Sequence, residues 1–345
     1  MRSFVTGLFD IKQMILSSIG LAEYDPLESY KLADDYLESR SSQSWDQLNL
    51  DKWREAMDFS QIEALHLEQE KPVFYEVMKD ELPSLKHLSF DWRNSGPSVP
   101  QERIEFIRSV PPLESLSITI GVPYYYDDGP KNRTRFPLDD ILDVHGRSLE
   151  SLSLKQLECR EPELRRPMLS VDDIDSIRES CSNLSHLCVD IDRNAAYGWP
   201  NHTFNAITNI SSLASLTLRL EIGADLHTGR EHGEYYWNEE GLGGQGPFRE
   251  PRMTLEIAEQ LFGDLRAKKQ GEQLSKVDFV VGDYENKPYS GPLYFPEWDE
   301  GRARMFTCEA AASNDEKEGY RCTMLGGRDP WDDELVALEG IDLYD

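Results

Sequence analysis

Leu113-Glu114-Ser115-Leu116-Ser117-Ile118 is the stretch of sequence that decides the fold. Its pattern, Leu-x-x-Leu-x-Leu, returns at residues 149–154 and again at residues 213–218. Looser copies of the same pattern begin at Ile62, Leu85, Leu184 and Leu274. A short motif that returns at long intervals is typical of a solenoid, and this motif is the strand signature of a leucine-rich repeat.

The spacing of the copies sets the boundaries of the repeats. Their first residues are separated by 23, 28, 36, 35, 29 and 61 residues. Leucine-rich repeats usually span about 20–29 residues, so the longer intervals must contain insertions. We place inserted loops at 121–135 and 223–252, with a shorter one at 158–169. Residues 61–282 are therefore expected to form about seven degenerate repeats.

Amphipathic segments that predict helices fall between the strands. They cover residues 72–82, 101–110, 138–145, 171–181 and 254–269. Ser170 is a favourable N-cap for the fourth of these helices. Each helix is followed by a turn and the next strand, which predicts an α/β fold. We expect a leucine-rich-repeat solenoid with parallel strands on the concave side and helices on the convex side.

The two ends of the chain depart from the repeat. Residues 1–60 contain predicted helices and are expected to form an N-terminal cap, because terminal repeats need covering. Residues 283–345 are expected to form a C-terminal cap with an acidic tail. A hairpin is predicted there, with strands at 304–309 and 320–325 and with Cys308 opposite Cys322. Two interpretations of this pair stay open: a redox-sensitive bond, or two small apolar strand residues, of which the second is the simpler.

Charge and cysteine content exclude several classes of function. The chain has 64 acidic and 36 basic residues, a formal net charge of -28, which opposes binding to nucleic acid or to anionic membranes. The same charge favours a basic protein partner. No long apolar run predicts a membrane span or a signal peptide. The odd count of five cysteines, without a Cys-x-x-Cys motif, indicates a reducing compartment, cytoplasmic or nuclear.

Catalytic patterns are weak throughout the sequence. Gly241–Gly246 lacks the Lys-Ser/Thr ending of a phosphate-binding loop and is interpreted as a flexible insert. The acidic pairs at 139–140 and 172–173 are expected at helix starts, where carboxylates favour the helix dipole. Histidines on three predicted strands belong to repeats too far apart to share a metal ion. We therefore expect no catalytic residue, no cofactor and no metal, and we do not expect an enzyme.

A column of small residues marks the first candidate binding surface. In a strand of this kind the leucines point inward and alternate residues point to the opposite face. The middle outward positions are His66, Ser89, Ser117, Ser153, Cys188, Thr217 and Asp278. Mostly small side chains leave room for a partner to approach the sheet, or they merely relieve crowding on a curved sheet. Both interpretations stay open.

Aromatic residues mark a second candidate surface, in the loops that follow the strands. They are Trp92, Tyr124, Tyr125, Tyr126, Tyr197, Trp199, Tyr235, Tyr236, Trp237, Tyr284, Tyr289 and Trp298. We call this set the aromatic rim. Tyr and Trp are enriched where binding energy concentrates, so the rim and the small-residue column are together expected to bind a protein partner. The alternative is that long loops fold back and cover the sheet with these rings.

One stretch resembles a known family. It runs Trp53-Arg-Glu-Ala-Met-Asp-Phe-Ser-Gln-Ile-Glu-Ala-Leu-His-Leu67, and Leu82-Pro-Ser-Leu-Lys-His-Leu88 follows. It is similar to the repeat region of filamentous-fungal F-box proteins, and the resemblance covers residues 45–325. The resemblance implies a substrate receptor of an SCF-type ubiquitin ligase, in which an F-box binds the ligase adaptor and the repeats hold the substrate.

The chain departs from this family at the F-box itself. An F-box normally opens with Leu-Pro-x-Glu, but the first Leu-Pro here, Leu82-Pro83, lies inside the repeats. Adaptor binding is therefore expected only if an F-box is encoded upstream of Met1. The alternative function is a stand-alone scaffold without a ligase link, and an enzyme with an aromatic-rimmed pocket is the least favoured.

Overall fold

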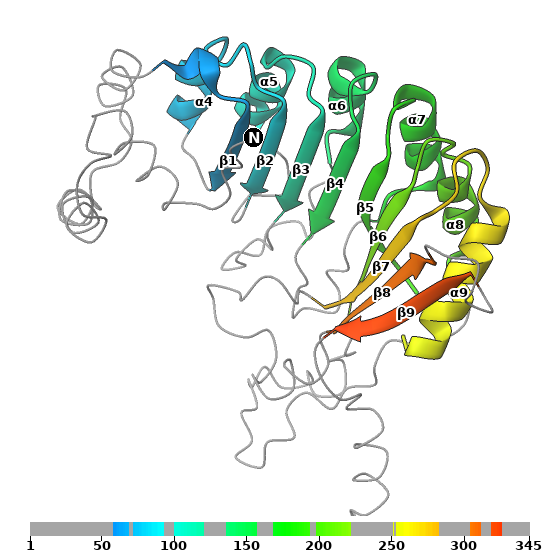
Figure 1. The fold of residues 1–345 in the computed structure, drawn as a ribbon. Helices are drawn as coiled ribbons and strands as arrows, with labels where there is room; N and C mark the ends of the chain where they lie inside the picture. The colour runs from blue at the N-terminus through cyan, green and yellow to red at the C-terminus, as the bar shows by residue number, and fades with distance from the viewer. Residues whose placement is uncertain are drawn as a thin grey trace, which may run out of the picture. The chain divides into compact units, whose positions relative to one another are not determined.

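A computed structural model of the chain describes residues 58–68, 72–92, 100–120, 136–156, 168–193, 198–221, 251, 253–282, 304–311 and 319–325 (Figure 1). The predicted N-terminal helices, the inserted loop at 121–135 and nearly all of the stretch 223–252 lie outside these residues. The shorter insertion, at 158–169, lies mostly outside them as well.

Strands and helices alternate along the described chain in an α/β fold (Figure 1). The strands are β1 (Ala64–Glu68), β2 (His87–Trp92), β3 (Ser115–Ile120), β4 (Ser151–Gln156), β5 (His186–Ile191), β6 (Ser215–Leu220), β7 (Lys276–Val281), β8 (Arg304–Ala310) and β9 (Tyr320–Leu325). They follow one another in chain order in a nine-stranded, mostly parallel sheet. The two pairs at the C-terminal end, β7 with β8 and β8 with β9, are antiparallel. Each of the seven motif copies contains a strand, as predicted.

The helices confirm the predicted alternation and add one element to it. They are α4 (Pro72–Met78), α5 (Gln101–Ser109), α6 (Leu138–His145), α7 (Val171–Ser180), α8 (Asn201–Thr208) and α9 (Leu255–Lys268), preceded by the short 3-10 helix η2 (Phe59–Gln61). The sequence did not predict α8, because Asn and Thr are weak helix formers. Its signal was Pro200 followed by Phe204 and Ile207, which are spaced by one helical turn and buried.

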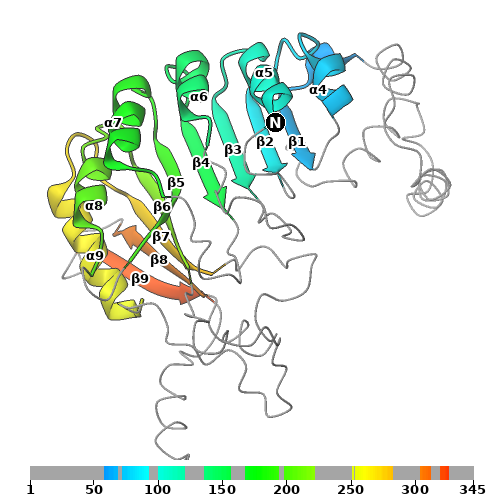
Figure 2. The same ribbon diagram turned by 180° about the vertical axis from the view of Figure 1, so that it is seen from behind.

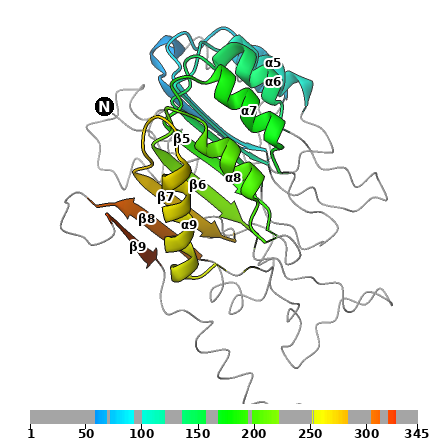
Figure 3. The ribbon, with the colours of Figure 1, turned by 90° about the vertical axis from the view of Figure 1, so that its right-hand side faces the viewer.

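The chain divides into two compact units, residues 1–153 and 154–345. In each unit the described helices cover one face of the strands (Figures 2 and 3). The opposite face carries none of the described helices, and we call it the helix-free face. Leucines fill the covered side: Leu116, Leu152 and Leu216 are each 0% exposed. Alternation along the strand therefore assigns each residue to one face, as the motif predicted.

Main-chain hydrogen bonds repeat from one strand to the next. The carbonyl of Lys86, one residue before β2, accepts the N–H groups of Glu114 and Ser115 at 2.8 and 3.0 Å. The carbonyl of Glu114 accepts the corresponding N–H groups of Glu150 and Ser151 at 2.8 and 3.1 Å. In the second unit, the carbonyls of the residues before β5 and β6 each accept two N–H groups in the same way. This repetition is consistent with a solenoid-like arrangement, in which each repeat packs on its neighbours.

The C-terminal hairpin extends the sheet of the second unit. Strands β8 and β9 are antiparallel, and Cys308 pairs directly with Cys322, as predicted. A disulfide joins these two residues, so the simpler interpretation of two small apolar residues is wrong. Helix α9 contacts both strands (Figure 3). The Phe262 and Tyr320 rings meet edge to face at 5.2 Å, and a Cβ at Gly263 would stand 2.9 Å from the Tyr320 hydroxyl. Glycine at 263 thus permits this close approach.

Candidate partner-binding surface

The predicted small-residue column is a true row across neighbouring strands. In the first unit His66 pairs with Ser89, and Ser89 pairs with Ser117. In the second unit the row runs across five strands, through Cys188, Thr217, Asp278, Thr307 and Thr323. The sequence analysis predicted the column only as far as Asp278. Thr307 and Thr323 each stand next to a cysteine of the predicted hairpin, and this alternation could have predicted that they continue the column.

Three members of the column are buried, although the sequence predicted that they would be exposed. Ser153 is 9% exposed, Cys188 is 3% exposed and Asp278 is 7% exposed. Cys188 is a short side chain between longer ones, His186 and Asp190, on the same face of its strand, and such neighbours cover it. Polar contacts with Lys276 on β7 and Thr307 on β8 hold the Asp278 carboxylate close to the sheet. Ser89, Ser117 and Thr217 remain half-buried and keep a polar group at the surface.

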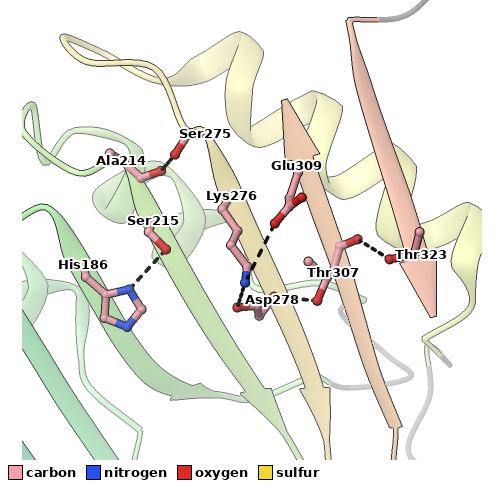
Figure 4. Close-up of polar contacts among 9 residues, drawn as sticks. All are labelled: His186, Ala214, Ser215, Ser275, Lys276, Asp278, Thr307, Glu309 and Thr323. Carbon is pink, nitrogen blue, oxygen red and sulfur yellow. Dashed lines mark hydrogen bonds and ion pairs between the residues drawn. The ribbon is translucent and has the colours of Figure 1, made fainter. Parts of the chain in front are cut away.

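Polar contacts link the strands of the second unit on the helix-free face (Figure 4). We define the polar strip as His186, Ser215, Lys276, Asp278, Thr307, Glu309 and Thr323. On β7, the Lys276 ammonium lies 3.3 Å from one Asp278 carboxylate oxygen. The Thr307 hydroxyl on β8 donates to the other Asp278 oxygen at 2.7 Å. The Asp278 carboxylate is therefore held from both sides, and it fixes the conformation of Lys276 and Thr307.

The outer members of the strip continue this network. The Lys276 ammonium also lies 4.0 Å from a carboxylate oxygen of Glu309. On β9, the Thr323 hydroxyl donates to the carbonyl of Thr307 at 3.5 Å. Toward β5, the His186 Nδ1 atom and the Ser215 hydroxyl are 3.1 Å apart. The strip thus consists of two groups of linked residues, one on β5 and β6 and one on β7, β8 and β9.

Charge and exposure decide which parts of the strip a partner can reach. The side chains of Glu309 and Lys276 are 63% and 38% exposed, whereas that of Asp278 is 10% exposed. Burial lowers the pKa of His186, the negative charge of Asp278 acts in the opposite direction, and the positive charges of Lys155 and Lys276 add to the lowering. At neutral pH His186 is therefore uncharged, and Lys276 and Glu309 are the charged groups that project from the strip.

A buried ion pair lies on the same face, two residues further along the strands. Arg219 and Asp190 are 3.5 Å apart, with side chains 6% and 3% exposed. The other Asp190 oxygen accepts the main-chain N–H of Gln156 at 2.7 Å. Asp190 therefore ties β4 to β5 and pairs with a cation on β6. The strand register places Asp190 directly opposite Arg219, an ion pair that the sequence analysis did not identify.

Most of the aromatic rim lies outside the described residues, and its role stays a prediction. This applies to Tyr124, Tyr125, Tyr126, Tyr197, Tyr235, Tyr236, Trp237, Tyr284, Tyr289 and Trp298. Trp92 was predicted in a loop, but it is the last residue of β2, because the strand continues one residue further and pairs Trp92 with Ile120. Trp199 is half-buried just before α8, and its carbonyl accepts the Asn201 N–H at 2.8 Å.

The acidic pairs serve the helices, as predicted. Asp139 and Asp140 stand in the first turn of α6. At the start of α7, the Ser170 hydroxyl accepts the Asp173 N–H at 3.1 Å, and the Asp173 carboxylate accepts the Ser170 N–H at 2.7 Å. This reciprocal pair is a capping box. Within the part of the chain that the structure describes, no three His, Cys, Asp or Glu side chains are grouped as metal ligands would be.

No family model matches this chain, and no curated protein matches it. Among the described helices, none has both the length and the apolar character needed to cross a bilayer.

Proposed function

We propose that the chain is a protein-interaction module built from leucine-rich repeats, and that it holds its partner on the helix-free face. Three observations support the repeat assignment. Each motif copy contains a strand. The motif leucines fill the covered side of the strands. The main-chain carbonyl of the residue just before a strand accepts two N–H groups from the next repeat, and this pattern recurs from repeat to repeat.

The polar strip is the observation that carries the proposed binding role. Within each of its two groups, polar contacts hold the side chains before any partner arrives, which lowers the entropy lost on binding. Lys276 and Glu309 place opposite charges where a partner can contact them, and this pattern favours a partner with complementary charges. Because the whole chain has a formal net charge of -28, long-range attraction favours a basic protein.

The resemblance to fungal F-box proteins supports a more specific role. In that role the partner is the substrate of an SCF-type ubiquitin ligase, and the repeats recognise it. Binding to the ligase adaptor requires an F-box encoded upstream of Met1. The alternative role is a stand-alone scaffold, which uses the same surface without a ligase. We do not propose an enzymatic activity.

Charge reversal on the strip tests the binding surface. Partners would be recovered by affinity purification from cells of the source organism, and the Kd of each purified partner measured. Glu309→Arg should raise the Kd of a basic partner about tenfold, which corresponds to a loss of about 1.4 kcal/mol in binding free energy. The matched control is Glu179→Arg on α7, where the side chain is 73% exposed on the helix side. Equal binding by both variants would remove the helix-free face as the binding surface.

Adaptor binding separates the ligase role from the scaffold role. The full gene product, with any sequence encoded before Met1, would be mixed with purified ligase adaptor, and an F-box protein would serve as the positive control. Co-elution supports the substrate-receptor role. Failure to bind where the control binds would leave the scaffold role alone.

A further inference from the structure

The disulfide between Cys308 and Cys322 joins the two outermost strands of the second unit. The two residues stand directly opposite each other in β8 and β9, with their Cα atoms 4.0 Å apart. They face α9: Cys308 is 0% exposed and its sulfur lies 3.7 Å from the carbonyl of Ala258. Cys322 is 6% exposed. The bond is therefore an internal clamp between the two strands rather than a surface link.

Strand β9 is the end strand of the described sheet and is held by β8 and α9. It stands at the end of the strand order, so β8 is its single strand neighbour among the described strands, whereas β5, β6 and β7 each have two. On the helix side, Tyr320 packs on Phe262. The Arg266 guanidinium donates to the carbonyl of Gly319 at 3.0 Å. An end strand opens more easily than a central one.

The same two strands carry the outer part of the polar strip. Thr307 and Glu309 flank Cys308 on β8, and Thr323 follows Cys322 on β9. Successive side chains of a strand point to opposite faces, so the disulfide lies on the covered side and the strip on the helix-free side. Any change in the pairing of β8 with β9 therefore changes the strip as well.

The remaining described cysteines do not compete for this bond. Cys181 and Cys188 do not take part in a disulfide, and they are 0% and 3% exposed. Burial raises the pKa of Cys181 to about 11, which keeps the thiol protonated at neutral pH. A protonated, buried thiol is a poor nucleophile in disulfide exchange. Among the described residues, a reductant therefore has a single disulfide to break, the one between Cys308 and Cys322.

We propose that the Cys308–Cys322 disulfide is a redox-controlled lock on the C-terminal hairpin. A dithiol reductant breaks the sulfur–sulfur bond by exchange: it gives two electrons and two protons, Cys308 and Cys322 become thiols, and the dithiol becomes a disulfide. The two sulfur atoms then move apart to van der Waals distance, and β9 loses its covalent link to β8. The hairpin then opens while β5 and β6 keep their pairing, and the polar strip loses its outer end.

Hydrogen exchange of the full chain tests the lock without any partner. Closing a loop with a sequence separation of 14 residues is expected to slow opening of the hairpin about a hundredfold. Dithiothreitol should therefore speed amide exchange in β8 and β9 about a hundredfold and leave β5 and β6 within about twofold. The variant Cys308→Ser/Cys322→Ser should exchange rapidly without reductant and should not respond to it. It is the matched control, because the reductant then has no bond to break.

Three results would overturn the lock. If non-reducing peptide mapping finds Cys308 and Cys322 as free thiols, the disulfide does not form and the proposal is wrong. If amide exchange in β8 and β9 is unchanged after verified reduction, the disulfide does not hold the hairpin closed. Faster exchange throughout residues 154–345 shows that the bond holds the whole unit rather than the hairpin.

The consequence for binding rests on the proposed function and is tested separately. A partner that uses the strip should bind the oxidised chain more tightly than the reduced chain. If the hairpin opens on reduction but a partner binds both forms equally, the link between the lock and the strip is wrong, whereas the exchange result still supports the lock.

Discussion

His145 joins neighbouring repeats of the first unit, and its replacement gives the sharpest test of how the repeats are held together. The side chain is 0% exposed at the end of α6. Its Nδ1 atom accepts the N–H of Leu113 at 3.3 Å, and its Nε2–H group donates to the carbonyl of Ile107 at 2.9 Å. These two bonds require a neutral imidazole with its proton on Nε2.

Removing the imidazole leaves two main-chain groups unpaired in the core. Each costs about 1–3 kcal/mol when it is buried without a partner, so His145→Ala should lower the free energy of unfolding by about 2–6 kcal/mol. His145→Asn keeps an acceptor near the position of Nδ1, and His145→Gln keeps a donor near that of Nε2. Each of these variants should therefore lose about half as much.

Urea unfolding followed by circular dichroism at pH 7.5 measures these differences. His202→Ala, at an exposed histidine of α8, is the matched control and should change the free energy of unfolding by less than about 0.5 kcal/mol. Hydrogen exchange in α5 and β3 should locate the loss in the first unit. If His145→Ala unfolds at the same urea concentration as the control, the two hydrogen bonds do not hold the repeats together.

The pH dependence of stability gives a second readout of the same residue. Burial lowers the pKa of His145, and the bond to Ile107 acts in the opposite direction. The unfolded chain therefore takes up the proton first. The stability from neutral His145 is fully present above about pH 6.5 and is lost as pH falls toward the folded pKa, at up to about 1.4 kcal/mol per pH unit. His145→Asn should flatten this fall, and equal slopes for both proteins would refute the assignment.

Three further substitutions test the core, a helix start and a buried charge by urea unfolding. Leu152→Ala, at a side chain that is 0% exposed, should cost about 3–5 kcal/mol, whereas Val171→Ala, at 38% exposed, should cost less than about 1 kcal/mol. Equal costs would mean that Leu152 is not a core residue. Ser170→Ala removes the cap of α7 and should cost about 1 kcal/mol, and no change would contradict the capping box. Lys269→Met leaves three main-chain carbonyls without their ammonium donor and should cost about 1–3 kcal/mol; a more stable variant would indicate that burying the charge outweighs its bonds.

The elements that the sequence predicted are those whose apolar residues fall at regular spacing. The prediction for α6 agrees with the structure at both ends, because Pro137 precedes it and Gly146 follows it. The motif strands were predicted because alternate leucines must all reach one core. Helix α8 was missed because its apolar side carries only two large residues, Phe204 and Ile207, beside the small Ala206.

The candidate site was predicted less well, because exposure depends on neighbours that are distant in sequence. Alternation correctly placed Cys188 and Asp278 on the helix-free face. It could not indicate that they are buried, since this depends on which side chains stand beside them on other strands. The facing of Cys308 and Cys322 followed from the symmetry of the hairpin, but pairing alone does not distinguish a bond from a contact.

The buried charges bear on the two interpretations of the small-residue column. Residues that only relieve crowding would be small and uncharged, because burying a charge carries a large desolvation cost. The helix-free face instead buries Asp190 against Arg219 and holds Asp278 between Lys276 and Thr307. Such contacts restrict the conformations of the groups that a partner would meet, and preorganised charges favour specific recognition. The buried charges of this face are therefore consistent with the proposed binding surface.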